Sequence, residues 1–144
     1  MGEATRITAE RETLPDGVRI SDGRGIITLR NPARHVELLR CEGYARAEHV
    51  DLVIESRERI LRECGKLAIF DDLEDLRGYD SEVRSRLTAW SRVNRPKIVA
   101  FHILLRSKIV AMGVSLANMA IGGAIVAHTN RTAFEQALAL QIRR

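Results

Sequence analysis

The chain has 144 residues, of which 45% are hydrophobic, 29% are charged and 4% are aromatic. This length suits a single domain with one hydrophobic core, and this composition excludes an intrinsically disordered chain. Cys41 and Cys64 do not form a CxxC pair, and no set of histidines and further cysteines stands beside them at metal-ligand spacing. We therefore expect two buried thiols in a reducing cytoplasm, in preference to a structural disulfide, with no metal site and no cofactor. The opening residues MGEATRITAE lack the basic and apolar regions of a secretory signal peptide.

Charge is distributed unevenly along the chain. Up to Glu82 there are 13 basic and 18 acidic residues, a balance of −5, whereas the remainder has 10 basic residues and one acidic residue, a balance of +9. Such an asymmetry is typical of a basic face that binds an anionic partner, unless the fold interleaves the two halves and mixes their charges. Nucleic-acid binding is not expected, because it needs exposed aromatic side chains among the basic ones, and Trp90 has the spacing of a core residue.

The predicted elements alternate between strands and helices after an N-terminal β-hairpin. In chain order they are a polar segment, frayed or at a sheet edge (1–15), a hairpin (18–29), a strand (35–42), a helix (45–63), a strand (66–73), a helix (80–94), a strand (97–105), a helix (107–121), a strand (124–128) and a last helix that begins at 130–132. This alternation predicts an α/β fold with a mixed, largely parallel sheet. Because no low-complexity linker divides the chain, we expect one domain over residues 16–144.

Turn and cap residues set the boundaries of these elements. Asp22-Gly23 is typical of a two-residue hairpin turn. Asn31-Pro32 predicts the end of the returning strand, and Gly43 predicts the end of the next one. Gly65 is placed to cap the first helix, and Arg95-Pro96 to end the second.

The third predicted helix needs a further argument, because Ile109 to Ala127 carry no charge. A run of this length would admit a membrane span. Gly122-Gly123 is typical of a helix end, however, and the residues after it have the pattern of a short strand. We therefore expect a buried helix at 107–121 and no membrane span.

The most informative stretch for function is Lys66 to Trp90, which is predicted to form an apolar strand, an acidic loop and a helix that begins at Asp80-Ser81. A hydroxyl at the positive end of a helix is a place where an added phosphate is favoured. Gly78, Tyr79, Asp80 and Ser81 are therefore candidate regulatory residues. The alternative is that Asp80 or Ser81 only caps the helix.

The remaining polar candidates have simpler interpretations beside the functional ones. Five carboxylates of the acidic loop have the oxygen chemistry of a cation site, but a solvated loop is preferred: Asp71, Asp72, Glu74, Asp75 and Asp80. His102 lies in an apolar strand and is interpreted as a buried, hydrogen-bonded histidine. His128 lies at a strand end near a helix start, where sites in α/β sheets often form. No catalytic residue is predicted, because no nucleophile or base accompanies the acids.

Three basic residues and one serine beside the apolar third helix are candidates for binding an anion or another ligand. These are Arg84, Arg106, Ser107 and Lys108. Ordinary solvation near a strand end is the alternative for them. The helix itself has the composition to line a lipid pocket or to pack against a second copy, although core packing is the default.

Two local patterns resemble the STAS domains (sulfate transporter and anti-sigma factor antagonist) and their SpoIIAA-like relatives. The element order agrees over about residues 35–142. Residues 36–43, VELLRCEG, are similar to the family's strand that ends in glycine before its first helix. Residues 73–81, LEDLRGYDS, are similar to the strand, loop and Asp-Ser that the family continues with Ser-Gly-Leu, where this chain has Glu82, Val83 and Arg84. The resemblance implies a SpoIIAA-like fold in which a partner kinase phosphorylates Ser81.

We therefore expect a cytoplasmic, non-enzymatic module that regulates or binds a protein partner. A homo-dimer is a further expectation, since an edge strand and charge polarity both promote self-association. The second hypothesis is a binder of a lipid-like or anionic small ligand, through the basic C-terminal half and the apolar third helix. The third is an enzyme, which would need the acidic loop and His102 or His128 to converge in one pocket.

Overall fold

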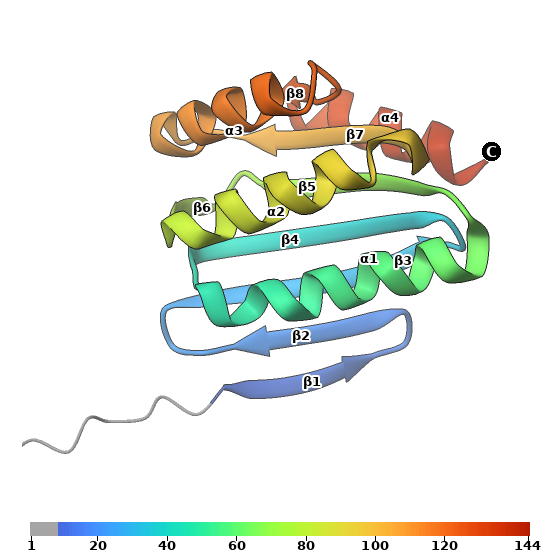
Figure 1. Cartoon of the computed structure of the whole chain (residues 1–144). Coiled ribbons are helices and arrows are strands. Elements are labelled where there is room, and N and C mark those ends of the chain that lie inside the picture. Colours follow the sequence, from blue (N-terminus) through green and yellow to red (C-terminus); the bar gives the residue numbers. More distant parts are fainter. Residues whose placement is uncertain (1–8) are drawn as a thin grey trace, which may run out of the picture.

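The computed structural model describes residues 9–144 as a mixed sheet of eight strands covered by four α-helices (Figure 1). The strands are β1 (Glu10–Leu14), β2 (Gly17–Ser21), β3 (Gly25–Ala33), β4 (Val36–Ala45), β5 (Leu67–Leu73), β6 (Leu76–Tyr79), β7 (Ile98–Leu105) and β8 (Val126–His128). The helices are α1 (Val50–Cys64), α2 (Ser81–Val93), α3 (Lys108–Ala120) and α4 (Arg131–Ile142), with short 3-10 turns η1 (Ala47–His49) and η2 (Arg95–Lys97). Residues 1–8 of the predicted polar segment lie outside the described residues.

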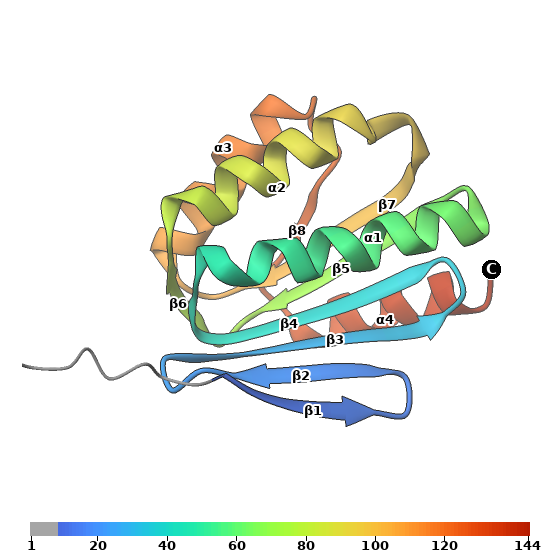
Figure 2. The ribbon, with the colours of Figure 1, turned by 60° about the horizontal axis from the view of Figure 1, so that its bottom comes forward.

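The strand order is β1-β2-β3-β4-β5-β7-β8, and β6 pairs with β4. The first four strands pair antiparallel, whereas β4, β5, β7 and β8 run parallel, as does β6 beside β4. The prediction of an α/β fold with a mixed, largely parallel sheet is thus confirmed. Figure 2 shows α1, α2 and α3 on one face of this sheet and α4 on the other.

The predicted acidic loop is wrong in part, because it contains a strand. The long strand β4 pairs with β5 along its first half and with β6 along its second half, and its register shifts at Gly43. Gly43 adopts a φ of 78° there and does not end the strand as predicted. A side chain at Gly43 would meet the carbonyl oxygen of Arg24, so the positive φ and the close approach both require glycine. This irregularity lets one strand serve two successive partners.

The N-terminal hairpin also differs from its prediction in detail. Three residues, 22–24, connect β2 and β3 rather than two. The Asp22 carboxylate accepts hydrogen bonds from the backbone N–H groups of Arg24 and Gly25 at 3.0 Å. The returning strand continues past Asn31-Pro32 to Ala33 through a bulge. The Asn31 side-chain amide bridges this bulge by donating to two backbone carbonyls, which is why the strand does not stop.

The helix predictions are confirmed within a few residues, except that α1 begins at Val50 and is preceded by η1. Gly65 caps α1 with a φ of 73°, and its N–H donates to the carbonyl of Leu61 at 2.8 Å. Gly122 and Gly123 follow α3 with φ values of 81°. Within residues 9–144, no helix is long and apolar enough to cross a membrane.

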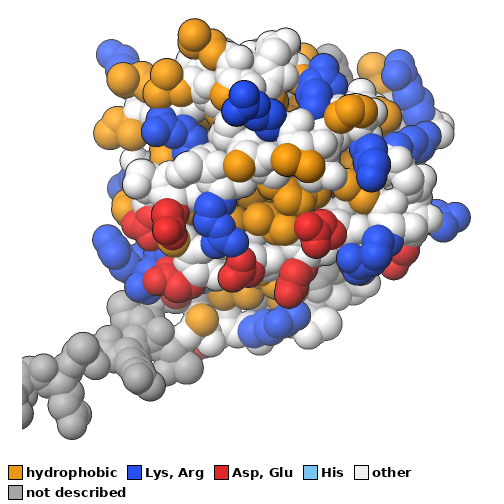
Figure 3. Space-filling model, viewed as in Figure 1, with side chains coloured by type: hydrophobic (Ala, Val, Ile, Leu, Met, Phe, Trp, Pro, Cys, Tyr) orange, Lys and Arg blue, Asp and Glu red, His pale blue; other side chains and the backbone are white. Residues whose placement is uncertain are grey.

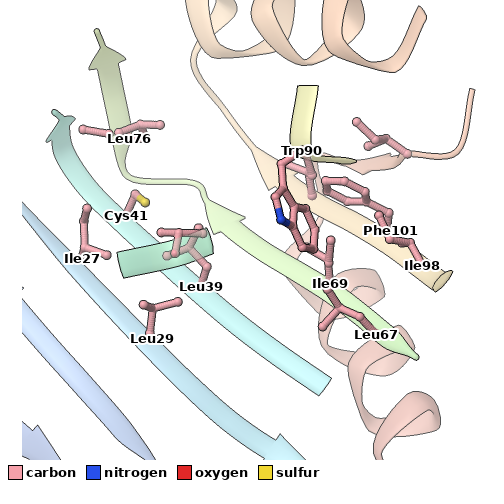
Figure 4. Packing of buried hydrophobic residues seen from close by; sticks show 14 of the residues in the cluster. Ile27, Leu29, Leu39, Cys41, Leu67, Ile69, Leu76, Trp90, Ile98 and Phe101 are labelled. Carbon is pink, nitrogen blue, oxygen red and sulfur yellow. The ribbon is translucent and has the colours of Figure 1, made fainter. Parts of the chain in front are cut away.

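Two hydrophobic clusters hold the layers together. The larger one lies between the sheet and helices α1, α2 and α3, where Trp90 packs over the sheet near Ile69 and Phe101 (Figure 4). The smaller one lies between the sheet and α4, where Phe134 meets Phe70 edge-on at a ring-centroid distance of 5.8 Å. Strand β5 is therefore buried on both faces, as its near-continuous apolar run predicts.

Candidate functional site

Asp80 links the start of α2 to the end of β4 through hydrogen bonds. Its carboxylate accepts a hydrogen bond from the Tyr44 hydroxyl at 2.7 Å and from the backbone N–H of Ala47 at 2.9 Å. These bonds lower the pKa of Asp80, the backbone bond from Ala47 being the larger cause. Asp80 occupies the N-cap position without a capping bond of its own, so it ties two elements together rather than capping α2.

The other three predicted regulatory residues surround Asp80. Gly78 and Tyr79 belong to β6 rather than to a loop, and the Tyr79 side chain packs so closely on Gly113 of α3 that a Cβ there would clash with its hydroxyl. Ser81 is the first residue of α2 and is exposed. Its carbonyl accepts a hydrogen bond from the Ser85 hydroxyl at 2.9 Å.

A buried ion cluster lies behind this segment, under α1. Arg57 is fully buried and donates from Nε to Glu37 at 2.8 Å and from Nη2 to Asp71 at 3.1 Å. The second oxygen of Glu37, Oε2, is buried without a hydrogen-bond partner among the described residues. Burial raises the pKa of Asp71 to about 6, with Glu37 adding to the effect and Arg57 opposing it.

Sequence reasoning missed this cluster and placed Asp71 in a solvated loop. The structure instead places Asp71 and Asp72 in β5, each with an arginine partner: Asp71 with Arg57, and Asp72 with Arg131 at 2.9 Å. The signal was present in α1, because Arg57 lies four residues after the buried Val53 and three before the buried Ile60. A basic residue on the apolar stripe of a helix needs a buried acidic partner.

An apolar cavity of about 110 Å³ opens between the sheet and helices α2 and α3. Asp71 and Arg57 line it together with Arg84, one of the four predicted binding residues. Its other walls are mostly apolar side chains, among them Leu39, Leu73, Leu87, Phe101, Val110 and Val114. The cavity thus combines an apolar interior with a small number of charged groups.

The structure does not bring the other predicted binding residues to this cavity. Arg106 is exposed and pairs with Glu74 at 2.8 Å. Ser107 caps α3, its hydroxyl accepting from the backbone N–H of Val110, and Lys108 is the exposed first residue of that helix. Of the four, Arg84 alone lines the cavity.

Helix α3 is not the buried helix that its composition predicts. Only Val110 and Gly113 are buried, while an apolar stripe on its outer side is between 53% and 80% exposed. The stripe consists of Ile109, Met112, Leu116 and Met119. Exposed apolar residues in a contiguous row are typical of an interaction surface.

Charge on this face remains segregated after folding. Figure 3 shows acidic side chains mainly over α1, and basic and hydrophobic side chains over α2 and α3. Helix α3 contains no acidic residue and α2 contains only Glu82. The surface of α2 and α3 is therefore mainly basic, although Arg86 of α2 pairs with Asp51 of α1 and so joins the two halves at this point.

The opposite face of the sheet carries His102 and His128, the two histidines considered as candidates. His102 Nδ1 lies 2.8 Å from His128 Nε2, and His102 stacks on Phe70 at a ring-centroid distance of 4.8 Å. Burial lowers the pKa of His102, and His128 adds to this effect. Neither His102 nor His128 lines the cavity that Asp71 lines.

The predicted acidic residues are held mainly by arginines. Asp72 and Glu74 share Arg131, at 2.9 and 3.3 Å. Asp75 pairs with Arg40 at 2.9 Å, and Asp80 accepts a hydrogen bond from Tyr44. Across residues 9–144, no three His, Cys, Asp or Glu side chains are arranged to hold a metal ion.

Comparison with known proteins relates the chain to others through its fold. No protein-family model and no curated protein matches it. Among solved structures, it is similar to an uncharacterised protein of the DUF3478 family with a SpoIIAA-like fold from Shewanella loihica PV-4. The TM-score is 0.56 over 91% of this chain and 92% of that one, at 10% sequence identity. The chain therefore has a SpoIIAA-like fold.

Proposed function

We propose that this SpoIIAA-like protein is a non-enzymatic interaction module that binds a protein partner through the outer face of α3. The observation that carries the proposal is the exposed stripe of Ile109, Met112, Leu116 and Met119. Methionine side chains are flexible and polarisable and adapt well to a partner surface. The spacing of three to four residues places the stripe along one side of the helix, as a helix-in-groove contact requires.

The charge around the stripe favours an acidic partner. Four basic residues of α2, η2 and the start of α3 are exposed on this side of the sheet, and α3 has no acid to balance them: Arg92, Arg95, Lys97 and Lys108. A second copy of the chain would bring two such basic surfaces together, which opposes pairing through this face. An acidic segment with apolar side chains complements both the stripe and the charge.

The docking surface is tested by the double variant Met112→Glu/Leu116→Glu. We expect it to lose binding by tenfold or more, because it places two charges in the centre of the apolar contact. Leu140→Glu is the matched control, since Leu140 is also exposed but lies on α4. The measurement is quantitative co-purification from native cells, followed by the affinity of the purified pair at low and high salt.

Two results would contradict this proposal. The first is a partner that the double variant and Leu140→Glu retain equally, or a partner that is not acidic and binds without salt dependence. The second is a different occupant of the stripe. A second copy would be seen as a dimer in analytical ultracentrifugation that the double variant dissociates, and a membrane as sedimentation with anionic vesicles that the double variant abolishes.

We further propose that Ser81 is the regulatory residue of this module. Its support is an exposed hydroxyl in the first turn of a 13-residue helix, next to an Asp80 that is already engaged elsewhere. A phosphate there would meet the free N–H groups of the helix start. Its negative charge would also lie at the edge of the basic α2–α3 surface and would weaken an acidic partner's binding.

Intact mass and phosphopeptide mapping of protein purified from its native cells test this role. We expect phosphate on Ser81 under at least one growth condition, and loss of that phosphate in Ser81→Ala but not in Ser85→Ala. Ser85 is the control because it lies one turn further along the same helix. An unmodified Ser81 across several conditions would reduce it to a structural helix residue.

A further inference from the structure

We propose that the cavity between the sheet, α2 and α3 binds a small anionic amphiphile, with its apolar chain inside and its carboxylate at Arg84. This is a second binding site, distinct from the outer face of α3 that the proposed function uses. The exposed residues of the stripe, such as Met112 and Leu116, do not line the cavity. The two sites share helix α3 but present opposite sides of it.

The side chains that line the cavity determine which class of ligand it can bind. Apolar side chains from four strands and two helices form most of the wall, so the interior favours a hydrocarbon over water. A cavity of 150 Å³ holds a benzene molecule, and by that standard the 110 Å³ found here holds roughly four to five carbon atoms. A short unbranched chain suits this space better than a long acyl chain.

The charges set the orientation of the ligand. Arg57 and Asp71 line one end of the cavity, and Arg57 is already bound to Asp71 and to Glu37, which does not line it, so two carboxylates face one guanidinium near this end. An anionic head would be repelled there once Asp71 ionises. Arg84 also lines the cavity, is only partly buried, and has no carboxylate within ion-pair distance among the described residues.

Arg84 is therefore the group that would receive the head. It lies in the first turn of α2, three residues after Ser81, at the boundary between the cavity and solvent. A guanidinium in this setting binds a carboxylate through paired hydrogen bonds. Tyr79 and Thr88 also line the cavity and add hydroxyl groups to its wall.

A chain-length series tests the cavity. The probes are butanoate, hexanoate, octanoate and decanoate, and the measurement is the dissociation constant from NMR titration of backbone amides. Each added methylene is expected to tighten binding about fourfold until roughly five carbons are inside, after which the affinity should level off. The shifted amides should be those of cavity-lining residues such as Val114 and Ala117.

Substitutions in the cavity test where the carboxylate and the hydrocarbon chain of the ligand bind. Arg84→Gln is expected to weaken hexanoate binding about tenfold, whereas Arg92→Gln, an exposed arginine of α2 outside the cavity, should leave it unchanged. Ala117→Leu should abolish binding by filling the space while keeping a folded spectrum. The Met112→Glu/Leu116→Glu variant should bind hexanoate normally, which separates this proposal from the docking surface.

Three outcomes would overturn the inference. Hexylammonium binding more tightly than hexanoate would mean that the acidic end of the cavity receives the head. Equal binding of hexanol and hexanoate would remove the role of Arg84. Amide shifts confined to residues outside the cavity would place any binding on the surface.

Discussion

Replacement of Arg57 by methionine is expected to lower the free energy of unfolding by about 3–5 kcal/mol at pH 7. The guanidinium is fully buried and is the counter-ion for Glu37 and Asp71 together. Its removal leaves two carboxylates close to each other in an apolar interior, and methionine restores only the volume. The measurement is urea denaturation of the variant and the wild type followed by circular dichroism.

Arg59→Met is the matched control for this prediction. Arg59 lies on the same helix, is exposed, and pairs only with Glu63 at 3.7 Å, so its replacement should cost less than about 1 kcal/mol. The triple variant Arg57→Met/Glu37→Leu/Asp71→Leu should recover most of the lost stability, because it removes the stranded charges. Equal costs for Arg57→Met and Arg59→Met would show that the buried cluster does not contribute as its geometry requires.

Much of the fold was predictable because local patterns determine it. Helical spacing places Val83, Leu87 and Trp90 on one side of α2, and Trp90 is indeed a core residue. The strand β6 could not be predicted in the same way. It has four residues in a charged segment, and it forms because β4 extends beyond β5 and offers Gly43 to Ala45 as partners.

The candidate site was less predictable because its contacts join distant parts of the chain. The apolar run at 66–73 predicts the strand, but its two carboxylates, Asp71 and Asp72, were assigned to the solvated loop because no local partner accounts for their burial. Their partners, Arg57 and Arg131, are 14 and 59 residues away. Arg84 was a candidate from its charge alone, and only the packing of α2 on the sheet places it at a cavity.

Helix α3 shows the reverse error, because the sequence predicted burial for side chains that the fold leaves exposed. Its composition is apolar nearly all round, which predicts burial. The sheet and α2 cover only one side, so Val110 is buried and Met119 is exposed. Sequence periodicity does not distinguish a covered side from an uncovered one when both are apolar, and here the uncovered side carries the proposed function.

Asp71→Asn is expected to change how stability depends on pH. The pKa of Asp71 is about 6 in the folded protein, against 3.8 for an unperturbed aspartate. The folded state therefore binds the proton more tightly, and this contribution to stability is fully present below pH 3.8 and is lost as the pH rises through about 6. The shift of about two units corresponds to a loss of about 3 kcal/mol over that window.

The asparagine variant has no proton to lose at this position. We expect its free energy of unfolding to exceed that of the wild type by up to about 3 kcal/mol at pH 7.5, and the difference to shrink or reverse at pH 4. The measurement is urea denaturation at several pH values. Asp75→Asn is the control, because Asp75 is exposed and pairs with Arg40, so its replacement should change stability by less than about 1 kcal/mol at either pH.

The pH dependence of stability also tests the charge inside the cavity, because Asp71 lines it. If the wild type and Asp71→Asn have parallel profiles, the carboxyl ionises in the folded protein as easily as in the unfolded chain, and burial does not govern its charge. If the profiles diverge as expected, the deep end of the cavity gains a negative charge near pH 6. A carboxylate ligand should then bind Asp71→Asn with an affinity that varies less across this range than its affinity for the wild type.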